Sequence, residues 1–210
     1  MRGKPIKETV TVWLIDVRNL KPVETQCLPL LTPERRRAAE GYQDQAARLR
    51  AIGAGLLLRK ALGVELDSDL SHNEYGKPFL TAGRPQFSLS NSGHYAALAV
   101  AETPVGMDIE LIKDEYPAVL RRYFLPDELE WLDRAPSDEW FYTLWTRLES
   151  VLKAEGVGFE GWRRRVCSLI REDGPWTVKN AVHNGHMIAC AAPKPFYLRL
   201  VNVNTDYLLK

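Results

Sequence analysis

Strand and helix signals occur in two successive sets along this chain of 210 residues, and their order constrains the fold more than any single motif. Strands are marked by a hydrophobic period of two residues and helices by a period of 3.6. The expected strands cover residues 9–17, 78–80, 86–90, 95–101, 105–110 and the region 165–203, and the expected helices begin at Thr32-Pro33, near Asp44 and near Tyr116. The second helix should end at Gly63, and the third region should end at Gly156 after a last segment capped by Ser137. This order favours an α+β fold over alternating β-α-β units.

The two sets meet near residues 103–106 and divide the chain into two similar halves, residues 1–104 and residues 105–210. Because no low-complexity linker separates the halves, we expect them to pack against each other. A cleft between two such halves is a common position for a ligand. We therefore expect the functional site in segments that can reach this junction.

Composition and charge exclude several classes of protein. A hydrophobic fraction of 45% with 26% charged residues is typical of a globular chain, and the net charge of +1 gives no bulk attraction to nucleic acid or to an anionic membrane. No apolar run approaches the roughly 18 residues that a bilayer crossing needs, and no signal-peptide core follows the first residues. The three cysteines are far apart. We expect a cytoplasmic protein without nucleic-acid or membrane partners.

The segment 32–60 carries an excess of basic side chains. They are Arg35, Arg36, Arg37, Arg48, Arg50, Arg59 and Lys60, against the acidic Glu34, Glu40 and Asp44. Such an excess can bind a small polyanion, and it can equally be the solvated face of a helix. The sequence alone leaves both interpretations open.

The expected strand 105–110 presents two carboxylates on one face. Its period of two places Val105, Met107 and Ile109 on one side and Asp108 and Glu110 on the other. Two carboxylates about 7 Å apart along a strand repel each other unless they are solvated or bridged by a cation such as Mg²⁺. The pattern therefore predicts either a metal site or a solvated strand end.

The last helical segment carries a charged pair beside its apolar stripe. The stripe consists of Phe141, Leu144, Trp145, Leu148 and Leu152. Glu149 and Lys153 lie four residues apart along the edge of this stripe. They can form a helical ion pair worth about 0.2–0.5 kcal/mol, or they can supply a third metal-directed carboxylate and a lysine for a phosphate. Spacing alone does not choose between the two.

Residues 87–94 form a strand that runs into a tight polar turn. Such a turn suits a phosphate as well as an ordinary hairpin.

Three other motifs match known functional patterns less well. Ser92 near His94 lacks the surroundings of a hydrolase nucleophile, and the glycines of segment 53–55 lack the third glycine of a dinucleotide fingerprint. His183 and His186 have no third metal ligand at a suitable spacing and are interpreted as structural or surface residues.

Several of these segments form an ordered set that covers most of the chain. They are Pro33-Glu34-Arg35-Arg36, Arg50, Leu56-Leu57-Leu58-Arg59, Tyr75-Gly76-Lys77-Pro78, Phe87-Ser88-Leu89-Ser90-Asn91-Ser92-Gly93, Pro104-Val105-Gly106-Met107-Asp108-Ile109-Glu110 and Trp145-Thr146-Arg147-Leu148-Glu149-Ser150-Val151-Leu152-Lys153. In this order they resemble the 4′-phosphopantetheinyl transferases of the Sfp type. Each motif is weak alone, but the ordered set is specific.

The resemblance implies the 4′-phosphopantetheinyl transferase fold, in which two α/β halves related by pseudo-twofold symmetry hold coenzyme A and Mg²⁺ between them. It also implies roles for individual residues. Asp108, Glu110 and Glu149 would bind the metal, Lys153 the pyrophosphate, Ser90 and Asn91 the nucleotide phosphates, with Lys77 beside the nucleotide and Arg35 and Arg50 contributing to phosphate binding. Two matched halves in one chain make a monomer the simplest expectation.

The implied reaction transfers 4′-phosphopantetheine from coenzyme A to a serine of an apo-acyl or peptidyl carrier protein and releases adenosine 3′,5′-bisphosphate. Glu149 or a metal-bound water would accept the serine proton, and Lys153 would stabilise the leaving anion. This chain departs from the family pattern at Asn91, where a histidine is usual, and at Leu148, where a lysine is usual. A degenerate module that only binds coenzyme A or a carrier, and a Mg²⁺-dependent nucleotide pyrophosphatase, are the alternatives.

Overall fold

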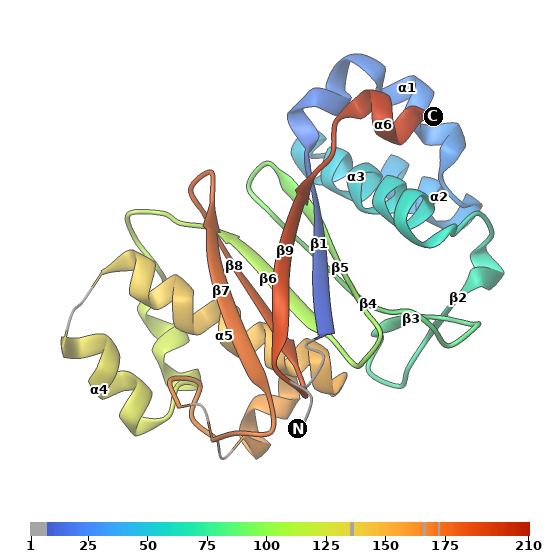
Figure 1. Cartoon of the computed structure of the whole chain (residues 1–210). Coiled ribbons are helices and arrows are strands. Elements are labelled where there is room, and N and C mark those ends of the chain that lie inside the picture. Colours follow the sequence, from blue (N-terminus) through green and yellow to red (C-terminus); the bar gives the residue numbers. More distant parts are fainter. Residues whose placement is uncertain (1–7, 135–136, 166, 172) are drawn as a thin grey trace.

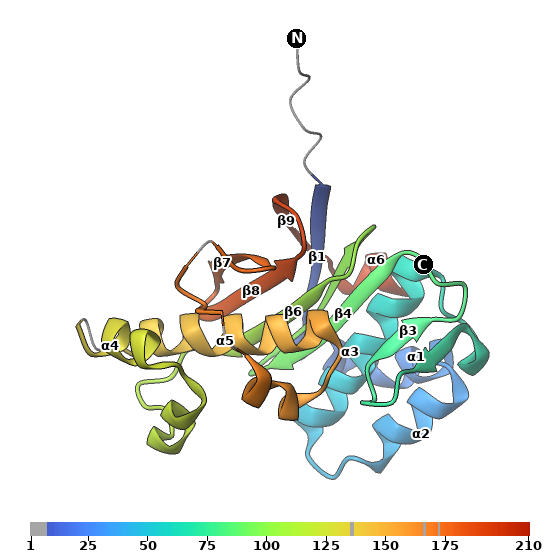
Figure 2. The same ribbon diagram turned by 90° about the horizontal axis from the view of Figure 1, so that it is seen from below.

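The computed structural model describes residues 8–134, 137–165, 167–171 and 173–210. One helix, α3 (Gln45–Leu62), packs on one face of a four-stranded sheet, and a second, α5 (Asp138–Glu155), packs on one face of a three-stranded sheet. The other faces of the two sheets pack against each other. Figures 1 and 2 show the two helices on opposite sides of this pair of sheets. The mixed α+β class is confirmed, and pseudo-twofold symmetry of the halves stays a prediction.

The four-stranded sheet has the order β4-β5-β1-β9. Its strands are β1 (Glu8–Asp16), β4 (Gln86–Ser92), β5 (Tyr95–Ala101) and β9 (Phe196–Asn202). Alternation along β1 sends Val10, Val12 and Leu14 to the core between the sheets and Ile15 to the core under α3. The predicted strands 9–17, 86–90 and 95–101 therefore agree with the structure to within two residues.

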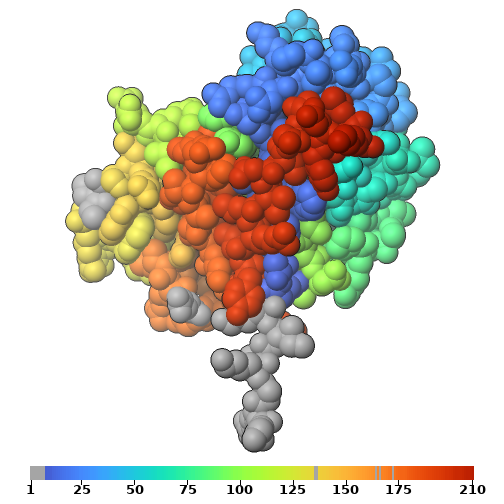
Figure 3. Space-filling model, turned by 45° about the horizontal axis from the view of Figure 1, so that its top comes forward, coloured from blue at the N-terminus to red at the C-terminus, as the bar shows by residue number. Residues whose placement is uncertain are grey.

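The last part of the chain returns to the N-terminal half. Strand β9 pairs in parallel with β1, and Leu208 of α6 (Thr205–Leu209) is buried in the core under α3. Figure 3 shows this red C-terminal segment at the surface between the blue N-terminal segment and the orange β7-β8 segment. A local hydrophobic pattern does not say which sheet a strand joins, and the division of the chain between residues 104 and 105 stays a prediction.

The helices of the N-terminal half begin and end where capping chemistry predicts. The Asp44 carboxylate accepts a hydrogen bond from the Ala47 amide at the start of α3, and Gly63 ends that helix with φ of 69°. The other elements here are η1 (Val17–Val23), α1 (Glu24–Cys27), η2 (Leu28–Leu30), α2 (Pro33–Gly41), η3 (Asp67–Asp69), β2 (Leu70–His72) and β3 (Pro78–Leu80). The helical turns at residues 17–30 and strand β2 were not predicted.

The three-stranded sheet of the C-terminal half is antiparallel, with the order β6-β8-β7. Its elements are β6 (Gly106–Leu111), η4 (Ala118–Tyr123), α4 (Pro126–Arg134), α5, η5 (Phe159–Arg164), β7 (Thr177–His183) and β8 (His186–Ala192). The helical region predicted from Tyr116 to Glu155 is confirmed as separate pieces, with residues 135–136 outside the described part. Strands fill only the later part of the predicted region 165–203, in which residues 166 and 172 are also not described.

Helix α5 lies unusually close to strand β6, and a glycine makes this possible. A Cβ atom at Gly106 would lie 1.9 Å from the carbonyl oxygen of Ser150 and 2.3 Å from the amide nitrogen of Ala154. The missing side chain lets the helix backbone rest on the strand, which brings one edge of α5 over the carboxylates of β6. None of the described helices has the length and apolar character needed to span a lipid bilayer.

Candidate functional site

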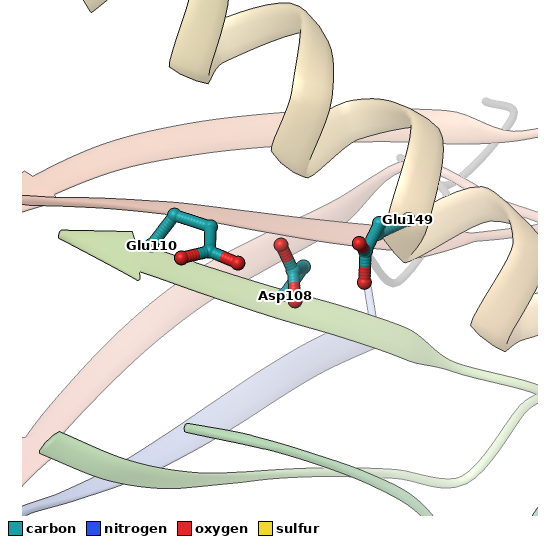
Figure 4. A group of neighbouring side chains, drawn as sticks. All are labelled: Asp108, Glu110 and Glu149. Carbon is teal, nitrogen blue, oxygen red and sulfur yellow. The ribbon is translucent and has the colours of Figure 1, made fainter. Parts of the chain in front are cut away.

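Three carboxylates converge where helix α5 crosses strand β6. Asp108 and Glu110 come from alternate positions of β6, and Glu149 comes from the edge of α5 that faces the strand (Figure 4). One oxygen from each lies within 4.8 Å of the others. The structure thus brings together the three carboxylates that the sequence selected, and we call them the acidic cluster.

The acidic cluster has too little positive charge around it. Burial and the neighbouring Asp108 raise the pKa of Glu149 to about 7, and the same two causes raise the pKa of Glu110. Asp108 is 1% exposed, and its Oδ2 atom has no hydrogen-bond partner among the described residues. An unsatisfied buried oxygen beside two mutually repelling carboxylates is the environment that a hard divalent cation would stabilise. The residues present therefore fit a bound Mg²⁺.

Lys153 forms ion pairs with two carboxylates of the cluster. Its Nζ lies 2.6 Å from Oδ1 of Asp108 and 3.4 Å from Oε2 of Glu149. Burial alone would lower the pKa of Lys153, but these two carboxylates outweigh it and raise the pKa. The helical ion pair that the sequence left as one alternative exists, and the same two residues also converge on the acidic cluster.

Serine hydroxyls of β4 reach the same carboxylates. Ser90 Oγ donates a hydrogen bond to Asp108 Oδ1 at 2.7 Å and accepts one from Lys153 at 3.1 Å. Ser92 Oγ donates to Glu110 Oε2 at 2.6 Å. Ser90 was expected to bind a phosphate. The contact of Ser92 with a metal-directed carboxylate was not predicted. The spacing of two residues between these serines on one strand face was the available signal.

A basic cavity of about 380 Å³ lies beside this site. Arg35, Arg50, Ser90 and Asn91 are among the residues that line it. Arg50 donates from Nε to the Asn91 Oδ1 atom at 3.1 Å and from Nη1 to the Gly93 carbonyl at 2.9 Å, and Arg35 Nε has no partner among the described residues. The structure therefore gathers four residues that the sequence analysis had assigned to phosphate binding.

A second cavity of about 310 Å³ lies at the junction of the halves and shares Leu89 with the first. Its walls include Tyr75, Phe87 and Phe159, and Glu149 and Lys153 also line it. The sequence analysis did not select these aromatic walls, because their elements are far apart in the chain. Both cavities therefore open next to the acidic cluster.

Lys77 lines the second cavity and also ties the β2-β3 hairpin to the C-terminal half. Its Nζ donates to the carbonyls of Val105 at 3.2 Å and Ala154 at 3.5 Å. Burial lowers the pKa of Lys77 to about 8. The structure thus places Lys77 at the junction, and its position beside a nucleotide stays a prediction.

The two departures from the family pattern differ in their surroundings. Leu148 is fully buried in the core between α5 and the sheet, as its place in the apolar stripe predicted. Asn91 is exposed and holds Arg50 at the edge of the basic cavity. Among the described residues, only the acidic cluster has metal-site geometry, and the interpretation of His183 and His186 as structural or surface residues stays a prediction.

The acidic cluster, whose geometry suits a divalent cation, lies between a basic and an aromatic cavity. Residues 104–191, which contain β6, α5 and the whole cluster, match the model of the 4′-phosphopantetheinyl transferase superfamily. The matched region thus includes the acidic half of the site.

Curated relatives extend this match across both halves. The chain is 26% identical to a 4′-phosphopantetheinyl transferase of Bacillus subtilis over 195 residues, which is 89% of this chain and 83% of that protein. It is 28% identical to the 4′-phosphopantetheinyl transferase Sfp of Bacillus subtilis strain 168, over 86% of this chain and 80% of Sfp. It is also 28% identical to the 4′-phosphopantetheinyl transferase psf-1 of Bacillus pumilus, over 80% and 76%. The chain is thus similar to the 4′-phosphopantetheinyl transferase superfamily over residues 104–191 and to these transferases over most of its length.

Proposed function

We propose that this protein transfers the 4′-phosphopantetheine arm of coenzyme A to a serine hydroxyl of an apo-acyl or peptidyl carrier protein. The observation that carries the proposal is the acidic cluster, which lies between the basic and the aromatic cavity at the junction of the halves. The names of the relatives, all 4′-phosphopantetheinyl transferases, support the same reaction. Dependence on Mg²⁺ and release of adenosine 3′,5′-bisphosphate are part of the proposal.

Coenzyme A matches the two cavities in its chemistry. Arg35, Arg50 and Asn91 offer guanidinium and amide donors to the phosphates of the nucleotide. The aromatic walls of the second cavity, Tyr75 and Phe159 among them, suit the planar adenine base. The pyrophosphate of the same molecule would then lie beside Lys153, between the two cavities.

The chemical step needs the serine oxygen to form a bond to the phosphorus that carries the pantetheine arm. The bond from that phosphorus to the bridging oxygen breaks, and adenosine 3′,5′-bisphosphate leaves as an anion. When bound by Asp108, Glu110 and Glu149, Mg²⁺ supplies the positive charge that neutralises the pyrophosphate. Lys153 adds a point charge for the leaving anion. Glu149 is the carboxylate proposed to accept the serine proton, with a water molecule of the site as the alternative.

The cellular setting forms a further part of the proposal. All three cysteines are free thiols, and Cys27 and Cys190 are buried, which agrees with a protein of the reducing cytoplasm. We propose that the protein acts there as a monomer on a carrier protein, without nucleic-acid or membrane partners. The near-neutral net charge of the chain supports the last point.

The test is to incubate the protein with coenzyme A, Mg²⁺ and several apo-carrier proteins and to measure the intact mass of each carrier. We expect one carrier to gain the mass of a single phosphopantetheine arm. Asp108→Ala should lower the rate by about 10²–10³-fold or more, because it removes a buried ligand of the cation. Asp206→Ala, which changes an exposed acidic residue of α6, is the matched control and should leave the rate unchanged.

Three outcomes contradict the proposal in different ways. Full activity of Asp108→Ala would remove the acidic cluster from the mechanism. Binding of coenzyme A without a mass gain on any carrier would favour a module that only binds. Release of adenosine 3′,5′-bisphosphate in the absence of a carrier would favour a pyrophosphatase.

A further inference from the structure

The two sheets meet along strands β4 and β6 without forming a β-ladder. Each of these strands is the edge of its own sheet, yet they lie side by side. The amide of Met107 donates a hydrogen bond to Ser88 Oγ at 3.0 Å, and the amide of Leu111 donates to Ser92 Oγ at 3.1 Å. Serine side chains of β4 thus take the place of the backbone acceptors that a neighbouring strand would offer.

Three serines at alternate positions of β4 make this connection, and we call Ser88, Ser90 and Ser92 the serine seam. Phe87 and Leu89, which alternate with them, pack in the core under α3. The seam therefore occupies the face of β4 that looks toward the C-terminal half. A helix-packed face and a hydroxyl face on one strand fix the register of β4 against β6.

Ser92 does more than satisfy a backbone amide. A hydroxyl group has one hydrogen to donate and two lone pairs that accept. Because the Leu111 amide already donates to Ser92 Oγ, the hydroxyl hydrogen is left for Glu110, whose Oε2 lies 2.6 Å away. This bond fixes one oxygen of a carboxylate whose neighbour on the strand is Asp108.

We propose that Ser90 and Ser92 of the serine seam align the acidic cluster across the junction of the halves, and that Ser92 is a positioning residue that orients Glu110 for a divalent cation. The inference rests on the proposed metal site and adds residues to it. Ser90 does the same for Asp108, but it also contacts Lys153 and lines the basic cavity, so its replacement would change several functions at once. Ser92 and Ser88 give the cleaner comparison.

Ser88 is the matched control within the seam. It is buried, it binds the same strand through the Met107 amide, and no hydrogen bond joins it to a carboxylate of the acidic cluster among the described residues. Replacing Ser88 or Ser92 by alanine removes a hydroxyl that accepts a hydrogen bond from an amide of β6. Only Ser92→Ala also releases a carboxylate.

The experiment measures Mn²⁺ binding to the full-length protein by electron paramagnetic resonance, without coenzyme A or carrier. We expect Ser92→Ala to raise the Mn²⁺ dissociation constant about 10-fold, the lower end of the effect of losing a hydrogen-bond partner of a metal ligand. Ser92→Thr, which keeps the hydroxyl, should restore binding to within about twofold. Ser88→Ala should also bind within about twofold of the wild type, although it lowers the melting temperature.

Three results would overturn the inference, and the last differs from the first two in what it removes. Wild-type affinity in Ser92→Ala, or an equal loss in Ser88→Ala, would show that the seam only connects the halves. Absence of Mn²⁺ binding by the wild type would remove the proposed metal site, and with it the role of the seam. If Ser92→Ala does not fold, Ser92→Cys, of similar volume but with a weak donor, makes the same comparison.

Discussion

The C-terminal half contains two carboxylate sites, each with a buried carboxylate, that are satisfied to opposite degrees. Glu128 of α4 is fully buried, and its carboxylate accepts hydrogen bonds from both Nη atoms of Arg165 and from the amides of Leu125 and Leu169. In the acidic cluster, Asp108 and Glu149 share the ammonium of Lys153, Glu110 accepts a hydrogen bond from Ser92, and an oxygen of Asp108 has no partner among the described residues.

The difference in hydrogen-bond partners distinguishes a carboxylate that is satisfied within the fold, Glu128, from carboxylates that are suited to bind a cation. The Arg165 guanidinium and two amides satisfy Glu128 from within the chain, and they tie α4 to the segment after η5. The acidic cluster lacks such partners, so its carboxylates repel one another until a cation arrives. We infer that Glu128 stabilises the folded state. Repulsion within the acidic cluster lowers the stability of the metal-free protein and favours the binding of a cation.

The largest expected effect is the loss of stability in Glu128→Gln. Removing this charge leaves Arg165 buried without its partner, which typically costs about 3–5 kcal/mol of unfolding free energy. Chemical denaturation at pH 8 measures this loss. Glu149→Gln is the comparison, because it removes one of three repelling carboxylates and should leave the unfolding free energy equal or higher. A loss of similar size in both variants would end the distinction between the two sites.

The acidic cluster could be predicted from the sequence because each part of it follows a local rule. A period of two placed Asp108 and Glu110 on one face of a strand, and the apolar stripe of α5 fixed the edge that carries Glu149. The contact between strand and helix came from the family resemblance. The close approach at Gly106 now gives the physical reason for that contact.

The ion pair of Glu128 and Arg165 could not be predicted, because the two residues are far apart in the chain. Glu128 and Arg165 are separated by 37 residues, and no spacing rule links them. The return of β9 to β1 was missed for the same reason, since paired residues such as Leu14 and Asn202 lie 188 positions apart. Local patterns predict which face a residue takes, but not which distant element covers that face.

The second prediction concerns the pH dependence of stability without metal. The pKa of Glu149 is raised from 4.5 to about 7, first by burial and then by Asp108. Between these two pH values the native state keeps a proton that the unfolded state has released, so the stability should fall as the pH rises from about 4.5 to about 7. The contribution of this residue is on the order of 3 kcal/mol.

Denaturation curves at several pH values test this second prediction. The difference between wild type and Glu149→Gln isolates the carboxylate, and it should grow as the pH rises and level off above about pH 7. Saturating Mg²⁺ should stabilise the wild type most above pH 7, where Glu149 is ionised, because a ligand that binds only the native state raises its stability. If the difference in unfolding free energy between wild type and Glu149→Gln does not change with pH, ionisation of Glu149 does not destabilise the native state.

The smallest expected effect belongs to an exposed ion pair on the helix that carries Glu128. Glu130 and Arg134 lie one turn apart on α4 with Oε1 and Nη2 separated by 2.5 Å, and their side chains are 66% and 71% exposed. Glu130→Gln should lower the unfolding free energy by less than about 0.5 kcal/mol, because water screens such pairs. Glu128 and Glu130 share one helix, so their comparison removes helix propensity from the argument. A loss in Glu130→Gln as large as that in Glu128→Gln would mean that α4 responds to any lost charge, and that burial beside Arg165 does not distinguish Glu128.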